Sequence, residues 1–368
     1  MNRRQILVST AALALAGKAP SSAAAATISA AAKALYARAL VFDADLSPPL
    51  SDAFPFPPSM LRMVRDSGVT AATTSLGGVD ADFEDTVAEI AFFQRMIEQY
   101  PDVFLQVRDA GDFTRAKREK KFGIVFSFES VEMFKGKVER IALFRNLGVR
   151  VMQLSYNKVS PWGSGVLADP PTGLIELGRK AVEAMNAHGV AIDISHADAA
   201  TSKDVLAASK APALITHAGC AAVHPHPRNK PDALLRAVAD KGGVVGIFDL
   251  PYLTESPRQP TLEDYMAHMT HALAVCGEDH VGVGSDSSLE PFDLSPKGVA
   301  EFQKDVAYRK KTGVSAPGED RPPYVIGLNT PRRSQTIADA LLKRGYPVRV
   351  AEKVLGLNFI RALGRIWG

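Results

Sequence analysis

Histidines and carboxylates follow several short apolar runs of the sequence, each at the point where a run ends. Imidazole and carboxylate groups are the ligands of hydrolytic zinc sites, which keep one position open for water. A single histidine after a strand is more often a hydrogen-bonded structural residue, and a single aspartate is often a helix cap. Their joint occurrence is what predicts a metal site, with the candidate residues Asp43, Asp45, Glu129, His196, His217 and Asp286.

The apolar runs that precede these residues have the composition of buried strands. Eight runs rich in Val and Ile alternate with longer segments of helical periodicity, which indicates repeated βα units. Continuous rather than alternating apolar character is typical of a parallel sheet covered by helices. The runs span residues 39–43, 69–75, 123–128, 149–155, 190–195, 213–216, 244–248 and 280–285.

Amphipathic helices are expected between the runs, at 83–99, 137–146, 174–188, 199–209, 232–241 and 262–276. Eight such repeats favour an α/β fold of the closed (β/α)8 TIM barrel type, as found in metal-dependent hydrolases, over an open doubly wound sheet. No glycine-rich phosphate loop follows the first run, which also counts against a dinucleotide-binding fold. Because barrel enzymes place reactive side chains at the carboxyl ends of their strands, we expect the candidate residues to converge there.

The C-terminal part of the chain departs from this repeat. Residues 287–331 are rich in Pro, Gly and charge around a helix near 299–311, and we expect a loop-rich insertion after the eighth strand. Two further helices are expected near 334–344 and 349–363.

Composition is that of a folded globular protein, with 46% hydrophobic and 23% charged residues in a chain of 368. Barrels of this length are single domains, so we expect one barrel domain over residues 27–368. Three of the 43 basic residues and none of the 40 acidic ones lie in the first 26 positions, which leaves the rest without net charge. A chain without basic excess is not expected to bind nucleic acid.

The first 26 residues have the order of an export signal. Arg3 and Arg4 precede an apolar run at 6–17 and small residues at 21–26. The paired arginines favour the twin-arginine route, with an ordinary Sec signal as the alternative. We therefore expect a periplasmic protein whose mature chain begins near residues 26–32, or one that keeps the segment as an anchor. The apolar run is shorter than the roughly 20 residues of a transmembrane helix, and no later segment approaches that length.

Cysteine usage provides no disulfide framework and no zinc-binding cluster. The chain has two cysteines, Cys220 and Cys276. Two unpaired buried thiols are the expectation, and a single bridge between them is the alternative.

The most specific motifs lie within residues 189–246. They are Ile194-Ser195-His196, Thr216-His217-Ala218-Gly219-Cys220, His226-Pro227-Arg228-Asn229 and Lys241-Gly242-Gly243-Val244-Val245-Gly246. With them, the chain from about residue 37 to 362 resembles the membrane (renal) dipeptidase family of zinc-dependent peptidases.

This resemblance implies hydrolysis of the peptide bond of dipeptides by metal-activated water. It implies that Glu129 bridges two zinc ions, that His196 and His217 complete the first site, and that Asp45 serves the second. Arg228 would bind the substrate's C-terminal carboxylate through a planar two-donor fork. Asp286 would handle protons at the centre of the site.

The sequence departs from the family at the second metal. Asp43-Ala44-Asp45 stands where the family has His-x-Asp, so a carboxylate replaces a histidine ligand. An additional anion lowers the net charge of that site and suits a harder ion such as manganese better than before. One or two zinc ions are therefore expected, with the second in doubt.

A second departure lies after the fourth strand, where Tyr156 replaces a family histidine near the substrate carbonyl. A tyrosine donates one hydrogen bond to a developing oxyanion but carries no positive charge near neutral pH. A catalytic and substrate-binding role for Tyr156 and a role as mere cavity wall both remain open.

Three functions are consistent with these residues: a metallodipeptidase, a related barrel hydrolase that cleaves another small amide with one firmly bound metal, and a non-catalytic periplasmic binding protein. We favour the first, because a protein without turnover has no need of both metal ligands and proton-handling groups. The sequence leaves open the side-chain preference, the native metal and whether the protein is a monomer or a homodimer.

Overall fold

The computed structural model describes residues 27–51, 54–78 and 81–368. The predicted export signal, residues 1–26, lies outside the described residues. No helix in the described part of the chain is both long and apolar enough to cross a membrane.

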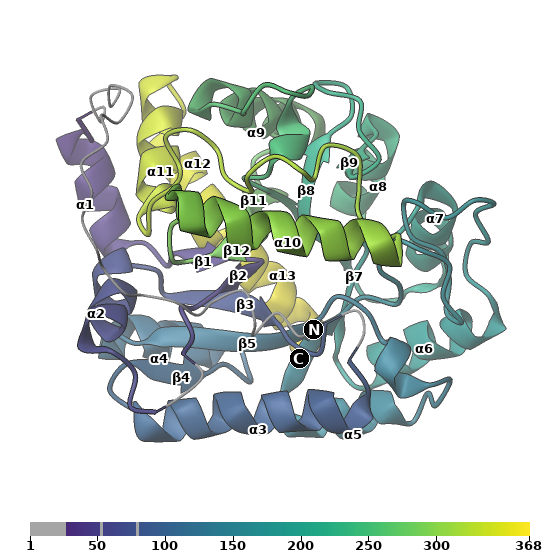
Figure 1. Ribbon diagram of the computed structural model, residues 1–368. Helices are drawn as coiled ribbons and strands as arrows, with labels where there is room; N and C mark the ends of the chain where they lie inside the picture. The colour runs from purple at the N-terminus through teal and green to yellow at the C-terminus, as the bar shows by residue number, and fades with distance from the viewer. Residues whose placement is uncertain (1–26, 52–53, 79–80) are drawn as a thin grey trace.

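Eight parallel strands close into a barrel, which confirms the predicted fold class (Figure 1). The last barrel strand pairs with the first, and every neighbouring pair is parallel. In order around the barrel the strands are β1 (Phe42–Asp43), β3 (Ala71–Ser75), β5 (Phe122–Phe128), β6 (Val149–Met152), β7 (Ala191–Asp193), β8 (Ala213–Cys220), β10 (Val245–Ile247) and β11 (Val281–Val283). Each lies within or overlaps one of the eight predicted runs.

Short strands extend this sheet outside the barrel. β4 (Phe104–Gln106) pairs with β5, and β9 (Asn229–Lys230) pairs with the end of β8. A separate pair joins β2 (Leu46–Ser47) to β12 (Ser287–Ser288).

Helices surround the barrel as the periodicity predicts. The strands are buried on both faces, and all seven residues of β5 are buried. Side-chain caps fix several helix starts; Asp82 caps α3, and Thr261 forms a capping box with Asp264 at the start of α9. The predicted surrounding helices are α3 (Phe83–Gln99), α5 (Arg140–Leu147), α6 (Glu176–Ala187), α7 (Ala199–Ala208), α8 (Asp232–Asp240) and α9 (Leu262–Cys276).

Within the described ranges, three α-helices were not predicted: α1 (Ala30–Arg38), α2 (Pro58–Ser67) and α4 (Gly111–Glu119). The chain ends in α11 (Arg333–Lys343), α12 (Val348–Glu352), a wide turn at Lys353–Leu357, and α13 (Asn358–Trp367). Cys220 and Cys276 are both free and buried, which confirms the expectation of unpaired thiols.

The amino end of the barrel is filled by apolar side chains. Phe359 and Leu363 of α13 pack in one cluster with Val125, Val151 and Leu214, which come from three barrel strands. Dense packing of this kind leaves the carboxyl end of the strands as the face where a ligand can enter.

Helix α10 (Pro296–Thr312) lies across the barrel strands in Figure 1, in the segment predicted as a loop-rich insertion. Ser295 caps its first turn, and it ends at Gly313 with a φ of 70°. Side chains of α10 line a cavity at the carboxyl ends of the barrel strands.

Candidate metal centre and substrate cavity

His196 follows strand β7 and is held by hydrogen bonds on two sides. Its backbone N–H donates to Oε1 of Gln153 at 3.0 Å, and its Nδ1 lies 2.7 Å from Oδ1 of Asn157. The Nδ2 group of Asn157 donates to the carbonyl of Val314, so Oδ1 is the acceptor and Nδ1 of His196 carries the proton. The remaining nitrogen, Nε2, is buried without a hydrogen-bond partner among the described residues.

His217 lies in strand β8 and is oriented in the same way. Its Nδ1 lies 2.8 Å from Oδ2 of Asp45 and 2.9 Å from Oγ1 of Thr216. Its Nε2 is also buried without a hydrogen bond to the described part of the chain. A carboxylate on one ring nitrogen with the other nitrogen left for a metal is a common arrangement of histidine ligands.

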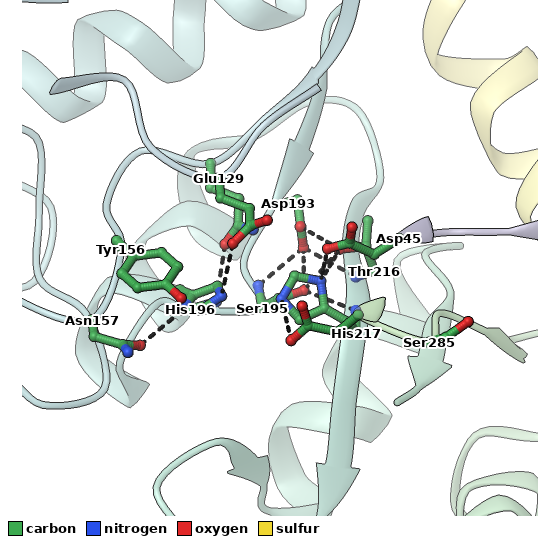
Figure 2. Close-up of polar contacts among 12 residues, drawn as sticks. Asp45, Glu129, Tyr156, Asn157, Asp193, Ser195, His196, Thr216, His217 and Ser285 are labelled. Atoms are coloured by element: carbon green, nitrogen blue, oxygen red, sulfur yellow. Dashed lines mark hydrogen bonds and ion pairs between the residues drawn. The ribbon is translucent and has the colours of Figure 1, made fainter. Parts of the chain in front are cut away.

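Asp193, at the end of β7, links the segments that carry His196 and His217 through hydrogen bonds. Its Oδ1 accepts from the backbone and hydroxyl of Ser195 and from the N–H of Thr216, while Oδ2 accepts from the Thr216 hydroxyl. Ser195 Oγ in turn accepts from the N–H of His217 at 3.1 Å. Figure 2 shows this network beside the two imidazoles.

Two groups of side chains have the composition of metal sites. Glu129, His196 and His217 bring one ligand atom each within 4.8 Å of one another, and so do Asp45, His217 and Asp286. Glu129 follows β5, and its Oε2 lies 3.6 Å from Nε2 of His196 (Figure 2). Two histidines and a carboxylate are a ligand set of catalytic zinc, and the unpaired Nε2 atoms fit a metal ion between them.

The charge state of His196 also suits a ligand. Complete burial is the largest cause that holds its pKa well below the usual value, and the positive charge of Arg228 acts in the same direction. The ring is therefore neutral near pH 7, which is the form that binds metals.

Asp43, which the sequence predicts as a metal ligand, belongs to neither of these two groups. Its Oδ1 accepts from the N–H groups of Asp45 and Ser285, at 3.1 and 2.8 Å, and its Oδ2 accepts from the Ser285 hydroxyl. This carboxylate therefore ties the end of β1 to the end of β11. Burial, the largest cause, raises the pKa of Asp43, while its bonds from Ser285 oppose the rise.

Asp286 lies at the mouth of the centre in an unusual backbone conformation. Its φ is 54°, a value that costs energy for a residue with a side chain. The N–H donates to the carbonyl of Asp45 at 2.8 Å, and Oδ2 lies 3.9 Å from Nε2 of His217. Burial raises the pKa of Asp286 to about 7; the His217 ring opposes this shift, and the Asp45 and Glu129 charges add to it. A carboxyl group with this pKa can accept and return protons near neutrality.

Two glycines, Gly246 in β10 and Gly284 directly after β11, explain how closely the strands meet here. A Cβ atom at Gly246 or Gly284 would lie 2.0 or 1.8 Å from the carbonyl oxygen of Thr216. No side chain fits at either position, so glycine permits the approach that places His217 opposite β11.

A cavity of about 390 Å³ opens beside the metal groups, bounded by Asp286 at one side and by α10 at the other. Arg228 reaches it from the loop after β8 and is 2% exposed. The Nε and Nη2 atoms of Arg228 are buried without hydrogen-bond partners among the described residues. A buried guanidinium in this state is strongly disposed to bind an anionic group.

Tyr156 forms the wall between His196 and α10. Its ring stacks on the His196 ring with centroids 4.0 Å apart and an interplanar angle of 26° (Figure 2). The structure thus brings together the predicted residues Asp45, Glu129, Tyr156, His196, His217, Arg228 and Asp286, and it sets Asp43 apart.

Several residues that support these side chains were not predicted from the sequence. Asn157 and Asp193 stand next to or near predicted residues, in Tyr156-Asn157 and Asp193-Ile194-Ser195-His196, and polar residues at strand ends were the available signal. Arg309, which donates to Tyr156, and Glu319, which pairs with Arg309, lie in the insertion, where no local pattern singles them out.

Comparison with known proteins gives matches over most of the chain. Residues 58–307 match the family model described as membrane dipeptidase, peptidase family M19. A dipeptidase of Claviceps purpurea is 28% identical over 289 residues, which are 78% of this chain and 61% of that protein. A dipeptidase of Clonostachys rogersoniana is 30% identical over 273 residues, 72% of this chain and 69% of its own length.

Solved structures agree with the fold. An amidohydrolase of Pseudomonas aeruginosa superposes with a TM-score of 0.81 at 28% identity, covering 92% of this chain and 99% of its own.

Proposed function

The chain belongs to the membrane dipeptidase family, peptidase family M19, and from this premise we propose that it is a metal-dependent dipeptidase. The observation that carries the proposal is the position of Arg228, a buried cation with two nitrogens unpaired among the described residues, in the same cavity as Asp286 beside the metal groups. A centre for hydrolysis and an anchor for a carboxylate within one cavity of about 390 Å³ suit a small substrate with a free C-terminus.

In the proposed reaction Arg228 binds the C-terminal carboxylate of the dipeptide and so places the peptide bond near the metal ligands. Tyr156 donates a hydrogen bond to the carbonyl oxygen as negative charge develops there. Asp286 accepts a proton from the attacking water and delivers it to the leaving amine. Glu129, His196 and His217 would hold a divalent ion, whose contribution would be Lewis-acid activation of water and carbonyl.

For the metal we propose zinc at the group Glu129, His196 and His217, where two imidazoles and one carboxylate would hold it firmly. The second group, Asp45, His217 and Asp286, shares His217 with the first. With Asp43 engaged by Ser285 and His217 serving the first ion, a second ion would have only Asp45 and Asp286 to itself. We therefore propose that one ion is bound firmly and a second one weakly.

The location of the protein remains a proposal from the sequence. Residues 1–26 are proposed to direct export to the periplasm, through the pattern that begins at Arg3 and Arg4. Cell fractionation with N-terminal sequencing tests this: a periplasmic chain that begins near residues 26–32 is expected, and an intact Met1 in the cytoplasm would refute it.

The activity is tested by hydrolysis of a panel of dipeptides combined with metal analysis of the same protein. Since this chain spans 61% of the Claviceps relative, activity has to be measured on this chain itself. We expect release of free amino acids that chelation removes and added zinc restores. No release by protein with a full equivalent of metal would refute the proposal.

A further inference from the structure

Arg309, near the end of α10, reaches back toward the metal centre. Its Nη2 donates to the phenol oxygen of Tyr156 at 3.1 Å, and its guanidinium carbon lies 5.8 Å from the centre of that ring. Tyr156 in turn stacks on His196, and Tyr156 and Arg309 both line the substrate cavity. Arg309, a residue of the insertion, is thus connected to His196 of the metal centre through the side chain of Tyr156.

Glu319 holds Arg309 in this position. Nε of Arg309 donates to Oε1 of Glu319 at 2.7 Å, and Nη2 forms an ion pair with the same oxygen. The other carboxylate oxygen accepts from the N–H of Ala316 at 2.8 Å. The side chains of Arg309 and Glu319 are only 18% and 15% exposed, so water screens this pair weakly.

The hydrogen bond from Arg309 determines what the Tyr156 hydroxyl can do. A phenol oxygen that accepts from a guanidinium has its own proton free to donate elsewhere. Among the described residues no acceptor is bonded to that proton, and the hydroxyl belongs to the wall of the cavity. A charged donor on the oxygen also polarises the O–H bond, which makes it a stronger donor.

From these contacts we propose that Arg309, clamped by Glu319, is a positioning residue that makes Tyr156 an effective hydrogen-bond donor to the carbonyl oxygen of the bound substrate. The inference rests on the proposed dipeptidase function. The pair Tyr156 and Arg309 supplies together a directed proton and a positive charge, whereas a tyrosine alone supplies only the first. It also gives α10 a role in the reaction besides covering the cavity.

If the role of Arg309 were purely structural, the effect of replacing it would not depend on the hydroxyl group of Tyr156. The end of α10 is tied to the barrel by other contacts as well: the Val314 carbonyl accepts from Asn157, and the Thr312 carbonyl accepts from Lys158. If Arg309 only fastened this segment, its loss would act in the same way whether or not residue 156 has a hydroxyl group.

The experiment is a double-mutant cycle on the zinc-loaded full chain with Tyr156→Phe, Arg309→Met and the double variant. It measures kcat and KM for one dipeptide and the Kd of a phosphinate dipeptide analogue, whose tetrahedral anion resembles the charged transition state. Loss of one oxyanion donor lowers kcat about 100-fold or more, and we expect this for Tyr156→Phe. Arg309→Met should lower kcat about tenfold or more in the wild type and less than about threefold in the Tyr156→Phe background.

The affinity for the phosphinate should fall in parallel with kcat, while KM changes little. Arg309→Lys, which keeps a charged donor, should recover part of kcat. The matched control is Lys310→Met, which removes the adjacent exposed cation and its 3.4 Å pair with Asp320 and should leave kcat unchanged.

Equal losses from Arg309→Met in both backgrounds, or a loss confined to thermal stability or KM, would overturn the inference and leave the dipeptidase function intact. A wild-type protein that carries zinc but neither hydrolyses dipeptides nor binds the phosphinate would overturn both.

Discussion

The Nδ1 atom of His196 lies 2.7 Å from Oδ1 of Asn157, and this hydrogen bond determines which nitrogen of the ring faces Glu129. Asn157 is itself fixed by its bond to the Val314 carbonyl at 2.8 Å. The insertion therefore orients a proposed metal ligand through one amide side chain.

Replacing Asn157 with Ala should weaken metal binding. Partners behind a metal-binding histidine contribute about 10- to 100-fold in affinity, and we expect a loss within that range. Competition with a chromophoric zinc chelator measures it. Asn358→Ala is the matched control, because Asn358 also bridges two backbone carbonyls, of Glu278 and Val281, but far from the centre. Equal zinc affinity of wild type and Asn157→Ala would contradict the proposed orientation.

His196→Ala and His217→Ala should each abolish firm metal binding and turnover, because a three-ligand site is left with two ligands. Metal content after dialysis is the measurement. His268→Ala is the control; His268 is fully buried too, but both ring nitrogens bond the backbone, at Cys220 and Leu253. That variant should lose stability and keep its metal. Retention of a full equivalent of metal by His196→Ala or His217→Ala would rule out that histidine as a metal ligand.

Asp43→Asn distinguishes a structural carboxylate from a ligand. The amide oxygen can still accept from the N–H groups of Asp45 and Ser285, whereas the bond from the Ser285 hydroxyl is altered. We expect a stability loss of about 1 to 3 kcal/mol by urea unfolding, with the firmly bound metal retained. If Asp43→Asn loses the firmly bound metal ion while its fold is intact, Asp43 is a metal ligand.

Lys230 should make stability depend on pH. Its Nζ donates to the Ala197 carbonyl at 2.7 Å, and burial, followed by the Arg228 charge, lowers its pKa to about 7. An unfolded lysine has a pKa near 10.4, so between about pH 7 and 10 the unfolded state binds more protons than the folded one. The unfolding free energy should therefore rise with pH in this window, by at most about 1.4 kcal/mol per pH unit from this group.

Urea unfolding of the metal-free protein at several pH values measures this rise. Lys230→Met removes the titrating group, so the difference between wild type and variant should grow in favour of the wild type as pH rises. Parallel curves for the two proteins would show that Lys230 has an ordinary pKa in the folded state.

The barrel and the ends of its strands could be predicted because they depend on local patterns. Val- and Ile-rich runs define the strands, and a polar residue directly after a run, such as Glu129 or His196, must lie at the carboxyl end. What the side chain does there depends on partners far along the chain. Asp43 bonds Ser285, 242 positions away, and Arg309 meets Tyr156 across 153 positions. No local spacing contains that information.

The same distinction explains the missed helices. Helix α4 begins Gly-Asp-Phe and carries five charged residues in nine, so only Phe113 and Ala116 mark an apolar face in the sequence. It is stabilised by the burial of Phe113 and Ala116, and Phe113 packs edge-on against Phe42 of β1. Tertiary packing rather than propensity decides such a segment.

Recognition of a free carboxylate by Arg228 is decided by comparing kcat/KM for one dipeptide with a free C-terminus and for its amidated form, using wild type and Arg228→Lys. Arg228 is buried with two donors unpaired among the described residues, so a free carboxylate should be strongly preferred by the wild type. Lysine lacks the two-donor fork, and we expect a loss of about 2 kcal/mol, or roughly thirtyfold, on the free dipeptide and little change on the amide. Equal hydrolysis of both forms by the wild type would contradict carboxylate recognition and favour a hydrolase of other small amides.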